Sequence, residues 1–279
     1  MPESASRRDV AIDWTRCDFS HGHEGGRVTS HFFNALSLFF PLGEKFFVHS
    51  VRHYRRAIRD PRLARDVTVF IGQEAMHSRE HREYVEAMRT QGHDPDACDV
   101  RLLDRPLEDV TPEERLAITA AMEHFTAALS RSMLLTPNFE QAPELRKLWV
   151  WHACEELEHK SVAFDVFREQ IGGGWRGYRM RCVAAVTASR LFLPQLLANH
   201  ARLLQADTGW SLLRCRWAAF RHAWLLPGVL LRLLPDFLRW FRPGFDPADD
   251  DDRALLARIQ ADPLLRPVFA HDDSRVSGS

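Results

Sequence analysis

The sequence lacks several features that would place it in a class at once. Its five cysteines are scattered and never form a Cys-x-x-Cys pair, so neither a disulfide framework nor a thiolate zinc site is indicated. Runs of about 18 apolar residues, the length that spans a membrane, are also missing. The first residues carry no apolar stretch of the kind found in secretory signals. We therefore expect a cytoplasmic protein without a membrane-spanning helix.

Net charge is almost absent as well. The 279 residues include 37 basic and 38 acidic side chains, which gives a formal charge of -1 at pH 7 and excludes a whole-chain electrostatic argument for nucleic-acid binding. The charge is nevertheless unevenly spread, at -6 over residues 1–175, +9 over 176–242 and -4 over 243–279. The fractions of hydrophobic residues (45%) and charged residues (27%) are those of a globular chain with a core.

Tyrosine is scarce and histidine abundant. Three tyrosines stand beside 14 histidines. Histidine is the commonest metal ligand and the usual acid or base near neutral pH, so its surplus directs attention to metal binding.

The spacing of apolar residues predicts an all-α fold. Between turn signals these residues recur every three or four positions rather than alternating. We expect four long helices, over about 30–59 with a kink at Pro41, 61–90, 112–136 and 143–171. Thr111 and Glu114 have the spacing of a capping box, and Gly172–Gly174 should end the fourth helix. Four helices of this length match the rods of a large four-helix bundle.

Two of these helices carry the same short motif. The second contains Glu74-x-x-His77 and the fourth contains Glu156-x-x-His159. Residues three apart lie on one helix face, so each motif can present a carboxylate and an imidazole to one ion. Both motifs fall in the stripe that should face the core, where unpaired polar groups are costly to bury. A pair of metal ions would satisfy them together.

The other two helices each supply one acid in an apolar setting. Glu44 is the only acid between residues 30 and 59 and has phenylalanines on both sides, and Glu123 lies within an alanine-rich stretch. His152 precedes Glu156 by four residues and so lies on the same face as His159. His81, four residues after His77, is a candidate for orienting a ligand by hydrogen bonding. By helical phase, Glu155 and Glu158 should point away from the site, as solvated or hydrogen-bonding neighbours, and His124 should not be a ligand.

This order of Glu, Glu-x-x-His, Glu, Glu-x-x-His resembles that of the ferritin-like carboxylate-bridged di-iron and di-manganese proteins. His152-x-x-x-Glu156-x-x-His159 resembles the sites of arylamine N-oxygenases within that group, and the whole chain resembles a bacterial family described as predicted metal-dependent hydrolases. The resemblance implies a ferritin-like four-helix bundle that binds two metal ions, iron first, with manganese or zinc as alternatives. The implied metal ligands are Glu44, Glu74, His77, Glu123, His152, Glu156 and His159.

The resemblance covers about half of the chain. We expect an amino-terminal extension (1–29), the di-metal bundle (30–174), a basic segment of amphipathic helices (175–245) and an acidic tail (246–279) that is partly disordered beyond Ser274. The basic segment either packs over the bundle or touches a membrane surface peripherally through residues 176–242.

Three functions remain open at this stage. The first is an enzyme that activates dioxygen to oxidise an organic, potentially apolar, small molecule. The second uses the same ligands for metal-dependent hydrolysis, and the third is a non-catalytic metal-binding protein. A homodimer is compatible with all three, and no nucleic-acid partner is expected because no known motif accompanies the arginines.

Overall fold

The computed structural model describes residues 8, 10–100, 110–136, 142–225, 228–262 and 265. Within these residues the chain is all-α, as predicted, and no strand occurs. The helices that build the centre of the molecule are α1 (Gly26–Ser37), α2 (Phe40–Tyr54), α3 (Pro61–Thr90), α4 (Pro112–Leu135), α5 (Pro143–His159) and α6 (Val162–Ile171).

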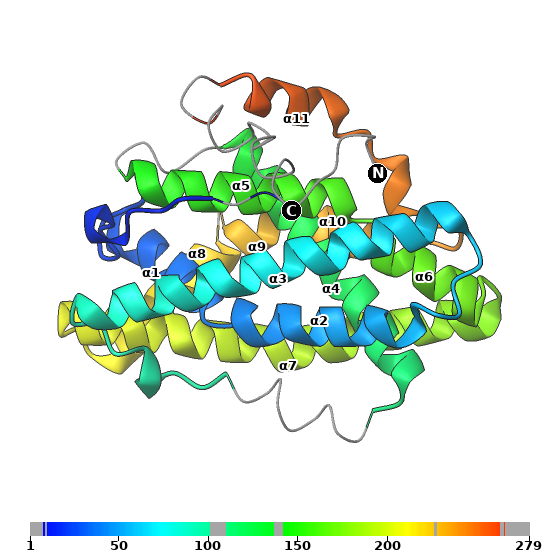
Figure 1. The fold of residues 1–279 in the computed structure, drawn as a ribbon. Helices are drawn as coiled ribbons and strands as arrows, with labels where there is room; N and C mark the ends of the chain where they lie inside the picture. The colour runs from blue at the N-terminus through cyan, green and yellow to red at the C-terminus, as the bar shows by residue number, and fades with distance from the viewer. Residues whose placement is uncertain are drawn as a thin grey trace, which may run out of the picture.

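The central part of the fold is a set of four packed helical rods, formed by α2, α3, α4 and α5 with its continuation α6 (Figure 1). Helix α2 packs on α3 and α4, and α3 and α4 in turn pack on α5 and α6. Their inward faces bury large side chains such as Phe70, Leu116 and Trp151. Every rod therefore has a face on one shared interior, which is where the predicted motifs should meet.

Capping fixes two of the helix starts as the sequence predicts. The Thr111 hydroxyl accepts from the backbone N–H of Glu114 (3.2 Å), and the Glu114 carboxylate accepts from the N–H of Thr111 (2.9 Å), which completes the capping box. At the start of α3, the Asp60 carboxylate accepts from the N–H of Arg62 (2.8 Å), and Pro61 occupies the first turn.

Two predicted helices are interrupted, which corrects the expectation of continuous rods. The helix expected over residues 30–59 is split into α1 and α2, and it starts earlier, at Gly26. Pro41 causes the split because it has no N–H to donate and its ring clashes with the preceding turn, so it stands in the first turn of a new helix rather than at a kink. The fourth helix is broken at Lys160–Ser161, but both residues keep right-handed helical backbone angles, so α6 continues the rod of α5.

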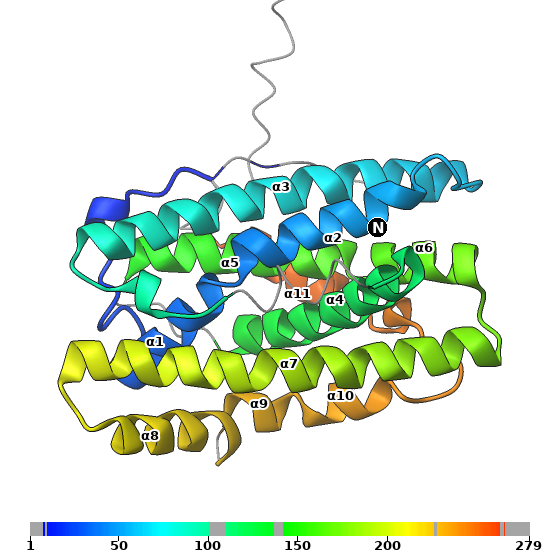
Figure 2. The same ribbon diagram turned by 90° about the horizontal axis from the view of Figure 1, so that it is seen from below.

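The basic segment packs against the bundle. Helix α7 (Trp175–Thr208) lies along α4 and α1, and α8 (Leu212–Trp224), α9 (Val229–Arg232) and α10 (Leu234–Arg239) follow it (Figure 2). Among the described residues, no helix has both the length and the apolar composition needed to cross a bilayer. Several large apolar side chains of this segment remain exposed, among them Leu213, Trp217 and Phe220 on α8.

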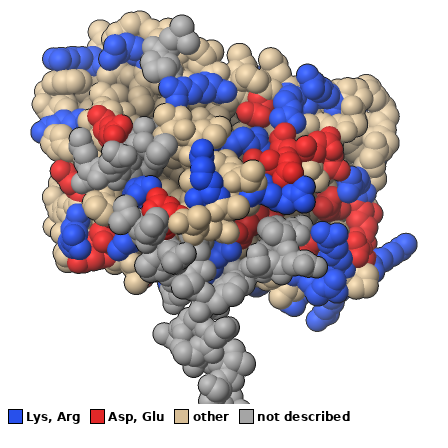
Figure 3. Space-filling view, turned by 90° about the horizontal axis from the view of Figure 1, so that it is seen from above, with Lys and Arg blue, Asp and Glu red and all other residues tan. Residues whose placement is uncertain are grey.

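The described part of the acidic tail folds back onto basic residues. Asp252 pairs with Arg131 (2.7 Å) and Lys160 (2.6 Å), and Asp250 pairs with Arg239 (2.8 Å), just before α11 (Arg253–Gln260). Acidic and basic side chains consequently lie intermixed on the face that Figure 3 shows. Residues 274–279, which the sequence predicts to be disordered, lie outside the described residues.

The junction of α6 and α7 gives a matched pair of glycines, Gly173 in the turn and Gly177 in the first turn of α7. A Cβ added at Gly177 would lie 2.1 Å from the backbone oxygen of Gly172, whereas one added at Gly173 would meet no described atom within 4 Å. We expect Gly177→Ala to lower the free energy of unfolding by about 1–3 kcal/mol, because backbone must move to relieve the overlap. Gly173→Ala should leave it unchanged within about 1 kcal/mol. Urea denaturation of both variants checks this, and equal stabilities would contradict it.

Candidate metal centre

The structure brings all seven predicted ligands together in the interior of the bundle. Glu44 comes from α2, Glu123 from α4, and the remaining five from α3 and α5. Each of these side chains is at most 3% exposed. Four overlapping groups of three have ligand atoms within 4.8 Å of one another, and they include every predicted ligand except Glu123, together with His81. Glu123 joins them through His159, whose Nε2 lies 3.3 Å from Glu123 Oε2.

One half of the cluster is centred on His159. Its Nε2 faces Glu74 Oε1 at 3.0 Å and Glu156 Oε1 at 3.6 Å, in addition to Glu123. Its other ring nitrogen, Nδ1, lies 3.2 Å from the side-chain oxygen of Gln73. Nε2 is thus the ring nitrogen that faces the carboxylates.

The other half contains His77 and His152, whose rings stack with centroids 4.0 Å apart. His152 Nε2 lies 3.1 Å from Glu156 Oε1 and 3.7 Å from Glu44 Oε1. His77 Nδ1 lies 3.7 Å from Glu156 Oε1 and 3.8 Å from Glu74 Oε1. Glu74 and Glu156 therefore face both halves, whereas Glu44 and Glu123 each belong to one.

The donor set fits a pair of metal ions. Among the described residues, both carboxylate oxygens of Glu44, Glu74 and Glu123 are buried without a hydrogen-bond partner, as are His77 Nδ1 and His159 Nε2. Leaving so many polar atoms unsatisfied in a protein interior is expensive, since each costs about 1–3 kcal/mol or more for a charged group. Cations coordinated by these atoms would remove that cost. Carboxylates and imidazoles without a thiolate suit iron, manganese or zinc.

Electrostatics in the metal-free cluster favour retained protons. Burial, reinforced by the neighbouring carboxylates, raises the pKa of Glu44 and Glu74 well above the ordinary value and that of Glu123 to about 7. Burial opposes charge on Glu156 too, but the adjacent imidazoles of His152 and His159 hold its pKa well below the usual range. Metal binding must displace the retained protons, so the affinity for metal rises with pH up to these raised pKa values.

Buried charged groups outside the ligand set hold two of the histidines in place. Glu155 Oε2 lies 3.1 Å from His77 Nε2, and Glu158 Oε2 accepts from Gln73 (3.4 Å), whose amide oxygen faces His159. Arg8 joins the two acids, with 2.8 Å bonds to both oxygens of Glu158 and a 3.3 Å contact with Glu155. Such outer partners fix the orientation and tautomer of ligating histidines.

His81 lies where the sequence suggests. Its Nε2 is 2.8 Å from His152 Nδ1, and its Nδ1 is 2.7 Å from the hydroxyl of Ser37. His152 is thereby left with Nε2 directed at the carboxylates. His124, which was expected not to be a ligand, instead faces the backbone oxygen of Asp236 at 3.0 Å.

Sequence reasoning left some of these supporting residues undecided and missed others. Helical phase places Glu155 and Glu158 away from the ligand cluster, as solvated or hydrogen-bonding neighbours, and the structure shows both buried against its outer side. Gln73 precedes the motif on α3, and its only sequence signal was this adjacency. Arg8 lies in the predicted amino-terminal extension, and no spacing rule connects it with α5.

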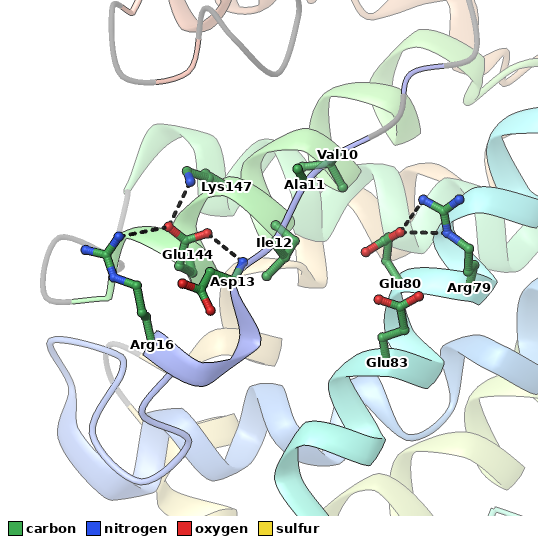
Figure 4. A pocket seen from close by; sticks show the side chains of 10 residues that line it. All are labelled: Val10, Ala11, Ile12, Asp13, Arg16, Arg79, Glu80, Glu83, Glu144 and Lys147. Carbon is green, nitrogen blue, oxygen red and sulfur yellow. Dashed lines mark hydrogen bonds and ion pairs between the residues drawn. The ribbon is translucent and has the colours of Figure 1, made fainter. Parts of the chain in front are cut away.

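A separate groove of about 600 Å³ lies between the amino-terminal segment, α3 and α5 (Figure 4). Its charged side chains pair with one another, for example Lys147 with Glu144 (2.8 Å) and Arg79 with Glu80 (2.8 Å). None of the residues that line it is a predicted ligand.

Replacing one shared carboxylate tests the ligand assignment. We expect wild-type protein to bind two Mn²⁺ ions and Glu74→Gln to lose at least one, measured by equilibrium dialysis with elemental analysis. Bound metal should stabilise the wild type by about 2.7 kcal/mol at a free concentration roughly a hundred times Kd. Without metal, Glu74→Gln should melt at the same or a higher temperature, because the amide resembles the protonated acid.

The matched control is Glu86→Gln, an exposed glutamate on the same helix. It should keep both ions and the full metal-dependent rise in melting temperature. Two bound ions in Glu74→Gln would remove that residue from the ligand set.

Arg8 offers a test of the outer contacts. Arg8→Met keeps much of the side-chain length but releases Glu155 and Glu158, so we expect metal affinity to fall about 10–100-fold. Arg253→Met, which removes an exposed arginine paired with Asp251, is the control. Competition with a fluorescent chelator measures both affinities, and unchanged affinity in Arg8→Met would show that these contacts do not tune the site.

Comparison with known proteins agrees with a metal-dependent function. Residues 6–251 match the sequence model of a family described as predicted metal-dependent hydrolase. No match was found among curated proteins or among solved structures. The match spans most of the chain, including Arg8, the bundle and the basic segment. The chain therefore belongs to the predicted metal-dependent hydrolase family.

Proposed function

We propose that the protein is an enzyme with a dinuclear iron centre that oxidises an organic small molecule with dioxygen. One observation carries the proposal: a glutamate from each of α2 and α4 meets a Glu-x-x-His pair from each of α3 and α5 in the bundle interior. This combination is the ligand pattern of carboxylate-bridged di-iron and di-manganese proteins.

The distances suggest how the ligands divide. Glu44, His77 and His152 would hold one ion, and Glu123 and His159 the other. Glu74 and Glu156, which face both histidine groups, would bridge them. Four carboxylates offset the four positive charges of two divalent ions, so the reduced centre would be neutral and compatible with burial.

Bound iron would supply the electrons that reduce dioxygen and the oxidising power for the substrate. The chain's own residues prepare the place where this happens. The Thr126 hydroxyl donates a hydrogen bond to Glu156 Oε2 and so fixes the orientation of that carboxylate. Phe40 packs on His81 and His152, with ring centroids 4.4 and 4.6 Å apart, and keeps water from this side of the cluster.

Hydrolysis is the second candidate, and the family description favours it. The same seven residues would hold the ions, and a bound ion would lower the pKa of water so that hydroxide is available at neutral pH. A non-catalytic metal-binding role is the third possibility. All three use the same ligands, so only the reaction separates them.

Anaerobic loading with iron(II), followed by exposure to dioxygen, tests the proposal. We expect oxygen consumption at an oxygen electrode in wild type and Glu86→Gln, and loss of it in His159→Ala, which lacks a central ligand. Zinc-loaded protein should not cleave nitrophenyl esters. Zinc-dependent ester cleavage without an iron–oxygen reaction would replace oxidation by hydrolysis, and retained metal with neither reaction would leave metal binding alone.

Two further expectations concern partners. Peripheral membrane contact through residues 176–242 is supported by the exposed apolar side chains of α8, which alternate with arginines such as Arg214 and Arg216. Homodimer formation likewise stays a prediction. Flotation with anionic liposomes and light scattering address them separately.

A further inference from the structure

An apolar cavity lies on one side of the metal cluster. It has a volume of about 320 Å³ and is enclosed by α1, α2, α4 and α7, with α9 and α10 completing the wall. Figure 2 shows α7 running beside α4, and α10 packs on α4. The volume falls in the range of small-molecule sites.

The chemistry of the wall selects an uncharged hydrocarbon. Among the described residues, no charged side chain lines the cavity, and the polar side chains of its lining are Thr126, Thr187 and Ser189. The remaining lining consists of aromatic and aliphatic groups. A charged or strongly polar ligand would lose its hydration here without gaining partners.

The cavity is long for its volume. Its wall on α4 extends from Ile118 to Leu129, which is about 16 Å at the rise of a helix, and its wall on α7 extends from Thr187 to Leu196. The apolar wall is therefore elongated along two helices, and an extended hydrocarbon chain can contact it over its whole length.

One end of the cavity reaches the metal cluster. Phe40, Thr126 and Leu129 line the cavity and also a small neighbouring space that His152 and Glu156 border. Thr126 makes the link most direct, because its hydroxyl donates to Glu156. Other parts of the wall reach the surface, since Leu191 and Leu234 line the cavity and are 45% and 40% exposed.

We propose that this cavity binds a single unbranched aliphatic chain, which enters beside Leu191 and Leu234 and places its reacting end next to Thr126. The inference rests on the proposed function in one respect, namely that a reaction occurs at the metal cluster. It assigns the substrate class, a long-chain aliphatic molecule, for oxidation and hydrolysis alike. Binding of the aliphatic ligand itself requires only the cavity and not the metal ions.

Filling the cavity tests the inference. Ala188 is buried in the wall on α7, and Ala188→Phe inserts a ring into the cavity. Val186→Phe, two residues earlier, adds the same ring at an exposed position outside the lining and is the matched control. Calorimetric titration of the full chain with dodecanol should show affinity at least about tenfold weaker in Ala188→Phe, or roughly 1.4 kcal/mol, and unchanged affinity in Val186→Phe.

A second measurement tests whether the bound aliphatic ligand lies beside the metal ions. In cobalt(II)-loaded protein, dodecanol should shift the visible absorption of the ion, because the reacting end lies beside Glu156. If Ala188→Phe fails to fold, Leu191→Glu supplies the test, since it places a carboxylate at the exposed entrance and should also weaken binding.

The outcomes separate the two proposals. Equal dodecanol affinity in wild type and the cavity variants overturns the substrate class, as does tighter binding of the planar ring compound pyrene than of dodecanol. If dodecanol binding follows the cavity variants while the chain binds no cobalt, the cavity assignment stands and the proposed metal function fails.

Discussion

The fold must compensate for the cost of burying seven ionisable side chains in its interior. Carboxylates and imidazoles occupy the space between four helical rods, where an ordinary bundle would place leucine and phenylalanine. Six carboxylate oxygens there have no hydrogen-bond donor within the described structure. An interior of this kind is stable only with protons or cations present, because isolated charges are prohibitively costly in a low-dielectric medium. The interior of the bundle therefore needs bound positive charge, as protons or metal ions, to be stable.

Hydrogen-bonded side chains outside the ligand set contact the histidine ligands on two sides of this centre. Towards the amino-terminal segment, Arg8, Glu155, Glu158 and Gln73 form a buried chain of charge-assisted contacts that ends on the outer nitrogens of His77 and His159. On another side, Ser37 and His81 hold the third histidine. The inner nitrogens are thus aimed before any ion arrives, which reduces the rearrangement that binding requires.

The sequence predicts contacts between residues that are close together in one helix better than contacts between distant segments. Helical spacing predicts that Glu74 lies beside His77, and the alignment of four rods then brings Glu44 and Glu123 to the same level. Periodicity alone does not predict the helix interruptions. It allows a kink at Pro41, whereas the structure starts a new helix there, and Ser37, the last residue before the break, contacts His81.

The missed supports share a different cause. Periodicity describes a helix relative to its own axis, and it cannot say which neighbour covers a face turned about 100° from the core. Glu155 and Glu158 occupy such a face on α5, and what covers it is a segment about 150 residues earlier in the chain. Contacts between such distant positions leave no local pattern in a single sequence.

The attachment of Arg8 gives the amino-terminal segment a thermodynamic link with the metal ions. If a docked segment favours metal binding by aligning His77 and His159, then bound metal favours docking of the segment by the same free energy, since coupling between two binding events is reciprocal. Arg8 and the metal cluster then respond together. Chelation would loosen the hold on Arg8, and a protease that cuts beside it would report on the metal content of the site that Arg8 reaches through Glu155.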